Sequence, residues 1–140
     1  MVDHVLIPTD GSPQARAALQ YAMEVHGNAR ITVLHVIDYV EESYSSEVLL
    51  GSETLHARAE QRADDLLADA REQAADHPGG VETDTVYGKP ARSIVDYAAD
   101  HDVDVVVMGS HGRSGVSRVL LGSVAQTVVQ RASVPVTVVR

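Results

Sequence analysis

"VDVVVMGSHGRSGVSRVLLGSVAQ", residues 103–126, places an apolar stretch directly before a loop rich in glycine and serine. The apolar part, residues 103–109, is the most apolar of the chain and predicts a buried strand, the best candidate for the centre of a sheet. A helix is expected from about Ser123 to Ala132. The loop between them does not end in Gly-Lys-Ser or Gly-Lys-Thr, so it is not a standard P-loop. Glycine turns and helix starts present backbone N–H groups to anions without a lysine, so this stretch predicts an anion-binding site.

Apolar stretches and helical patterns alternate along the rest of the chain. Strands are expected at residues 2–7, 31–38, 81–88, 103–109 and 134–140, and helices from Pro13 to Gly27-Asn28, at 54–76, from Pro90, and at 123–132. Residues 39–52 are acidic and irregular and predict a mobile loop or a short helix. The alternation predicts an α/β fold, a single domain over residues 1–140 with a parallel sheet covered on both faces. Pro135 favours an edge position for the last strand.

A ligand site is expected where two strands end. In open α/β sheets, ligands bind beyond the carboxyl ends of the strands, at the point where the strand order reverses. The first strand ends in Pro8-Thr9-Asp10 and the fourth in Met108-Gly109. If these strands are neighbours, the ligand lies between them.

Asp10 has two interpretations. It either closes an Asx turn before the first helix or binds a ligand. Ser12, followed by Pro13, already supplies the helix cap, so ligand binding is favoured.

The loop carries the groups that a phosphate needs. Gly109 and Gly112 would allow close approach of the backbone to phosphate oxygens. Ser123 and Gln126 match a capping box at the start of the last helix. Two arginines between the glycine turns would pair with phosphate charge, Arg113 and Arg118.

The charge of the chain excludes several partners. Acidic residues outnumber basic ones 20 to 11, with Lys89 the only lysine, which gives a formal net charge of −9. This argues against binding to nucleic acid or to anionic membranes. The composition suits a salt-adapted organism, because molar salt shortens the Debye length to about 3 Å and screens self-repulsion. The alternative is an acidic mesophilic protein with arginine-biased codons.

Other counts exclude other classes of protein. The chain has no cysteine, no signal-peptide pattern and no run of 18 apolar residues, so a cytoplasmic protein outside the membrane is expected. Seven scattered histidines predict no metal site. His35, in an apolar strand, is expected in the core or at an interface. Three basic residues are interpreted as surface charges: Arg16, Lys89 and Arg92.

The glycine spacing Gly109-x2-Gly112-x9-Gly122-Ser123, directly after a buried strand, is fairly specific. Together with "HVLIPTDGS", "ITVLHVID" and "VYGKP", it makes the chain similar to the universal stress protein family, specifically its ATP-binding branch. The resemblance covers the chain except for residues 39 to about 76. It implies a Rossmann-like, doubly wound sheet of five strands. It also implies a homodimer in which the last strands, residues 134–139, pair edge to edge.

The same resemblance implies an adenine nucleotide, ATP, with or without Mg²⁺. Asp10 would bind the ribose hydroxyls. The adenine pocket would be lined by Pro8, Thr9 and the backbone around Val36. The sugar would be flanked by Met108 and Gly109.

The resemblance also places the phosphates. They would be held by Gly112, Arg113, Gly122, Ser123 and Val124. His111 lies in the same loop and either contacts phosphate or stays solvated. Ala125 departs from the family pattern, because related ATP binders often carry a hydroxyl residue near the phosphates.

Three functions are compatible with these residues. The first is a homodimeric regulator in the stress response whose state depends on ATP. The second is a weak ATPase or phosphotransferase, which needs a base or water-positioning group near the terminal phosphate. No Walker lysine or aspartate pair is visible in the sequence, so a regulator is favoured over an enzyme. The third is a dimerisation module of the same fold that binds no nucleotide.

Overall fold

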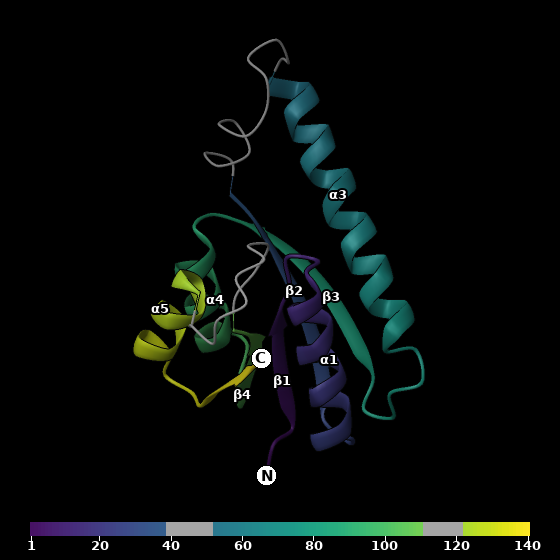
Figure 1. The fold of residues 1–140 in the computed structure, drawn as a ribbon, viewed down its shortest axis with the longest axis vertical. Helices are drawn as coiled ribbons and strands as arrows, with labels where there is room; N and C mark the ends of the chain where they lie inside the picture. The colour runs from purple at the N-terminus through teal and green to yellow at the C-terminus, as the bar shows by residue number, and fades with distance from the viewer. Residues whose placement is uncertain (39–51, 111–121) are drawn as a thin grey trace.

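The computed structural model describes residues 1–38, 52–110 and 122–140 (Figure 1). Strands and helices alternate along these residues as the sequence predicts. They are β1 (His4–Pro8), α1 (Pro13–Val25), β2 (Arg30–Ile37), α3 (Ser52–Gln73), β3 (Val81–Tyr87), α4 (Pro90–Asp100), β4 (Val105–Gly109), α5 (Ser123–Arg131) and β5 (Val136–Val139). The predicted loop over 39–52 falls outside the described residues except for Ser52, which is the first residue of α3.

The five strands form one parallel sheet in the order β3-β2-β1-β4-β5. The chain winds from β1 outward through β2 to β3, then crosses back to β4 on the other side of β1. The order therefore reverses between β1 and β4, which are direct neighbours. This confirms the doubly wound α/β fold and the predicted adjacency of the first and fourth strands.

Alternation along β1 divides the core into two layers. Val5 and Ile7 pack with α1 and α3 on one face of the sheet, whereas Leu6 packs with α4 and α5 on the other. Figure 1 shows the same division, with the two pairs of helices on opposite sides of the strands. Successive side chains of a strand point to opposite faces, so an uninterrupted apolar run is what a sheet covered on both faces requires.

The predicted centre of the sheet was one strand away from the true one. β1 is the middle strand and is buried along its whole length, while β4 lies between β1 and the edge strand β5. Both inner strands need apolar side chains on both faces, so hydrophobicity alone does not separate them. The edge position of β5 is confirmed, and Pro135 lies just before the strand.

Candidate nucleotide site

The turn after β1 is built by side chains that bind the backbone. Asp10 Oδ1 accepts the N–H of Ser12 at 3.0 Å, and Thr9 Oγ1 accepts the N–H of Gly11 at 3.1 Å. Ser12 Oγ accepts the N–H of Ala15 at 3.1 Å, which confirms Ser12 as the cap of α1. Asp10 therefore does close an Asx turn, and its carboxylate is held in place at the carboxyl end of the central strand.

Two hydrogen bonds connect this turn to β2. The N–H of Thr9 donates to the carbonyl of Leu34 at 2.8 Å, and His35 Nδ1 lies 2.9 Å from the carbonyl oxygen of Thr9. A carbonyl only accepts, so Nδ1 carries the hydrogen in this contact. His35 is half-buried and lines the cavity described below, so the expected core position is wrong, and the alternative of an interface position stays a prediction. Near its carboxyl end, a parallel strand can expose a side chain to a cavity, even when the strand is mostly apolar.

Gly109 brings the end of β4 against the first turn of α1. A Cβ atom at this position would lie 2.8 Å from Cβ of Gln14 and 2.9 Å from its carbonyl carbon. The absence of a side chain is therefore required by the packing of α1, in addition to the approach to phosphate expected from the sequence.

The ends of the glycine-rich loop meet at the mouth of the same site. The N–H of Gly122 donates to the carbonyl of Ser110 at 2.5 Å, and the N–H of Ser110 donates to the carbonyl of Val139 at 2.8 Å. Ser110 is buried. The start of α5 is thus fixed beside the ends of β4 and β5.

The helix α5 begins with backbone N–H groups that no carbonyl of the helix can accept. Gly122 is its N-cap and makes no side-chain capping bond, and Ser123 is already the first helical residue. The predicted capping box is therefore wrong, because the bond between Gly122 and Ser110 brings the chain into the helix one residue earlier. The first N–H to bond within the helix is that of Gln126, to the carbonyl of Gly122 at 2.9 Å. The N–H groups of residues 123–125 lack helical partners and form the positive end of the helix dipole.

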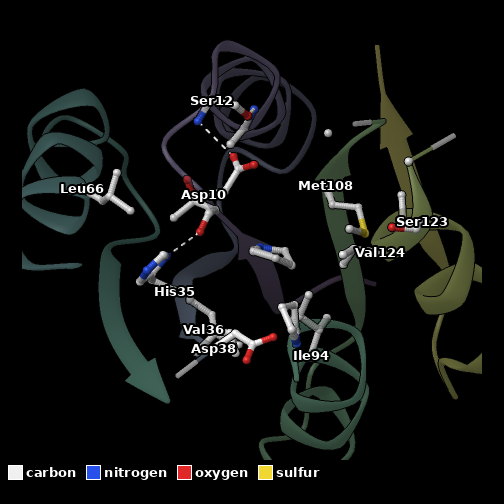
Figure 2. A pocket seen from close by; sticks show the side chains of 18 of the residues that line it. Asp10, Ser12, His35, Val36, Asp38, Leu66, Ile94, Met108, Ser123 and Val124 are labelled. Carbon is white, nitrogen blue, oxygen red and sulfur yellow. Dashed lines mark hydrogen bonds between the residues drawn. The ribbon is translucent and has the colours of Figure 1, made fainter. Parts of the chain in front are cut away.

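These elements surround one cavity of about 550 Å³, a size typical of small-molecule sites. Figure 2 shows Asp10 between two walls, with Met108, Ser123 and Val124 on one side and His35 and Leu66 on the other. Nine residues predicted to bind a ligand line this cavity: Pro8, Thr9, Asp10, Val36, Met108, Gly109, Gly122, Ser123 and Val124. The other predicted residues, His111, Gly112 and Arg113, and the nearby Arg118, lie outside the described residues.

Several residues that line the cavity were not predicted to belong to the site. Arg62 and Leu66 reach the cavity from α3, and Pro90 and Ile94 reach it from α4. Leu66 also closes the space beside Gly11, where an added Cβ would collide with its Cδ2 atom. The spacing of the apolar residues of α3 predicts one buried face, formed by Ala63, Leu66, Leu67, Ala70 and Ala74. The tilt of the helix decides that Leu66 reaches the site, whereas Leu67, Ala70 and Ala74 pack in the core.

Asp38 is the acidic residue at the end of β2 that lines the cavity. Its side chain is 13% exposed, and one carboxylate oxygen, Oδ2, lies 3.6 Å from Nζ of Lys89. Lys89 was interpreted as an ordinary surface charge, whereas it contacts a residue of the cavity wall. The sequence held a signal for this contact. Asp38 ends "HVID" and Lys89 lies in "VYGKP", and the two segments lie at the ends of neighbouring strands.

The described residues were searched for metal-binding clusters and for membrane-spanning helices. Across residues 1–38, 52–110 and 122–140, no group of three or more His, Asp or Glu side chains is arranged to hold a metal ion. Among the helices of that part of the chain, none is long and apolar enough to cross a membrane.

Comparison with known proteins gives consistent matches over the whole chain. The family model described as "Universal stress protein family" matches residues 1–140. The universal stress protein YxiE of Bacillus subtilis is 32% identical over 159 residues, covering 100% of both proteins. The universal stress protein MJ0577 of Methanocaldococcus jannaschii is 30% identical over 155 residues, covering 100% of this chain and 96% of the relative.

Solved structures share the fold. The structure of MJ0577 superposes with a TM-score of 0.85 at 31% identity, covering 99% of this chain and 96% of that one. A universal stress protein solved in complex with cAMP superposes with a TM-score of 0.72 at 24% identity, covering 99% and 97%. At that identity the second match bears on the fold alone.

Proposed function

The chain belongs to the universal stress protein family, and we propose that it is an ATP-binding member that acts as a homodimeric, nucleotide-responsive regulator in the stress response. The cavity at the strand reversal is the proposed binding site. A cytoplasmic location is part of the proposal, because ATP is an intracellular metabolite.

One observation carries the proposal. The Asp10 turn lies about one hundred residues before the stretch that holds the end of β4 and the N-terminus of α5, yet all three line one cavity. Asp10 is assigned to the ribose hydroxyls, and the N–H groups of the first turn of α5, which have no acceptor within the helix, are assigned to the phosphates. A fold-related protein holds cAMP, so the fold can accommodate an adenine nucleotide.

The assignment divides the cavity into three parts. The adenine side is formed by Pro8, Thr9 and Val36, and the sugar is flanked by Met108 and Gly109. Gly122, Ser123 and Val124 hold phosphates from α5. From the loop, His111, Gly112 and Arg113 are proposed to complete the phosphate site, with or without Mg²⁺.

A regulator fits the described residues better than an ATPase does. Asp10 already accepts the N–H of Ser12, and it lies at the β1 end, assigned to the ribose. No lysine lines the cavity among the residues that the structure describes. A phosphoryl-transfer enzyme needs a group that positions the attacking nucleophile at the terminal phosphate. Turnover far slower than nucleotide exchange is therefore expected.

The dimer is proposed to form through the open edge of β5. All four residues of β5 are only half-buried in the single chain. The carbonyls of Pro135 and Val139 face β4, since they accept the N–H groups of Val106 and Ser110. Neighbouring residues of a strand point their backbone groups to opposite edges, so Val136 and Val138 present theirs to the open edge. A second copy of the strand would satisfy them.

The test is to purify the protein in high KCl, denature it, and identify any released nucleotide by mass spectrometry. Gly122→Val is the matched control. Gly122 has φ −66° and ψ 161°, which valine adopts readily, so the variant should fold but obstruct the phosphates. We expect ATP or ADP from the wild type and none from the variant. Equal amounts from both proteins would contradict the placement of the phosphates.

A further inference from the structure

We propose that the Asp38 carboxylate selects the base of the bound nucleotide, favouring a purine with an exocyclic amino group over one with a carbonyl at the same position. The inference rests on the proposed nucleotide-binding function and deepens it. The observation behind it is a mostly buried carboxylate at the end of a mostly apolar slot.

The slot lies on the adenine side of the cavity. Apart from Thr9, its lining there is apolar: Val36 from β2, Pro8 from β1, and Pro90 and Ile94 from α4. Figure 2 shows Val36, Asp38 and Ile94 together at one end of the cavity, away from Met108 and from Ser123, which lies on the phosphate side. An apolar pocket with few polar groups is the usual arrangement in which those groups fix the orientation and identity of a ligand.

The chemistry of Asp38 determines the direction of the preference. Its side chain is 13% exposed, and its Oδ2 lies 3.6 Å from Lys89 Nζ. An ionised carboxylate accepts about four hydrogen bonds and donates none. An amino group of the base would donate to it, whereas a carbonyl oxygen would place two acceptors against each other. A bound base also removes water from the carboxylate, so the mismatch would not be compensated.

If Asp38 only stabilised the fold, its replacement would have different effects. The N-cap of α4 is Lys89, which makes no side-chain capping bond, and a nearby carboxylate stabilises a helix N-terminus through the dipole. If this were the whole role of Asp38, its replacement would lower stability and weaken all nucleotides equally. Base preference is therefore the readout that separates the two roles.

The experiment compares three nucleotides on the full chain: ATP, inosine triphosphate, and purine riboside triphosphate, which carries neither the amino nor the oxo group. We expect the wild type to bind ATP at least about tenfold more tightly than either analogue. Asp38→Asn keeps the shape of the side chain and adds an amide donor, so inosine triphosphate should gain and the preference should disappear or reverse. Lys89→Ala is the matched control, because it removes the ion pair and leaves the acceptor, so the preference for ATP should persist.

The outcomes separate this inference from the proposed function. Wild-type protein that binds the three nucleotides equally overturns the role of Asp38 and leaves nucleotide binding intact, and this result requires no variant to fold. The same preference in Asp38→Asn as in the wild type also overturns it. Protein that binds none of the three contradicts the proposed function itself.

Discussion

Gly11 supports the turn that carries Asp10 through both its backbone and its lack of a side chain. Its φ is +80°, and an added Cβ would collide with Leu66 of α3. Gly80 has nearly the same backbone, with φ +84°, but a Cβ there would meet no atom within 4 Å. A comparison of alanine variants at the two positions therefore separates the cost of backbone strain from the cost of a steric collision.

We predict that Gly11→Ala destabilises the protein by about 2–5 kcal/mol, the sum of left-handed strain and overpacking. Gly80→Ala should cost only about 1–2 kcal/mol, because it adds strain alone. Urea denaturation of both variants in the same buffer gives the comparison. Equal losses of unfolding free energy would mean that α3 moves away from the turn at no cost.

At the scale of elements, α4 and β3 are joined through a buried phenol. Tyr97 is 8% exposed, and its hydroxyl donates to Asp84 Oδ2 at 2.8 Å. The pKa of Tyr97 is raised well above its ordinary value of 10.0. Burial of the phenol is the larger cause, and its hydrogen bond to the Asp84 carboxylate is the second. The neutral phenol is thus favoured in the folded state. Its contribution to stability is complete below about pH 10 and declines as the pH rises toward the folded-state pKa.

Tyr97→Phe should change the alkaline limb of the stability curve. We predict a loss of about 2 kcal/mol at neutral pH, since a hydrogen bond to a charged group is removed. Above about pH 10 the unfolding free energy of the variant should fall less steeply than that of the wild type. Tyr21→Phe, on the exposed side of α1, is the control for tyrosine titration in general. Parallel curves for the wild type and Tyr97→Phe would contradict this origin of the slope.

The open edge of β5 is the proposed contact between the two copies of the dimer. Val138→Pro removes an N–H that points away from β4, so the variant should keep its fold and lose the proposed strand pairing between copies. Val138→Ala retains the donor and should remain dimeric. Sedimentation velocity at matched concentrations measures the assembly. A dimeric proline variant would exclude this edge as the interface.

Elements and turns were predictable from local signals, and the outline of the sheet from their alternation, whereas contacts between distant segments were not. Ser12-Pro13 predicted the start of α1, and Pro135 predicted the edge strand, because each acts on its own backbone. The choice of middle strand, the entry into α5 at Gly122 and the reach of Leu66 all depend on contacts between distant segments. The candidate site could be predicted in outline because most of its residues follow directly on strand ends.

For the whole molecule, charge is the property with the widest consequence. A net charge of −9 on 140 residues makes self-repulsion a general cost of the folded state. We propose that the protein is adapted to high salt, and we predict that its unfolding free energy rises between 0.1 M and 2 M KCl as the Debye length shortens from about 10 Å to under 3 Å. The gain should shrink near pH 4.5, where carboxylates are partly protonated. A stability that is flat or falling with KCl at pH 7 would support the interpretation as an acidic mesophilic protein.

The cavity between β1, β4 and α5 is proposed to bind an adenine nucleotide. The most direct test of this claim is the unfolding free energy of nucleotide-free protein in high KCl, measured with and without ATP. At one hundred times the dissociation constant, a ligand that binds only the folded state adds about 2.7 kcal/mol. We predict this gain for the wild type and none for Gly122→Val. A wild-type protein whose stability does not change with ATP, and which releases no nucleotide on denaturation, would contradict the claim.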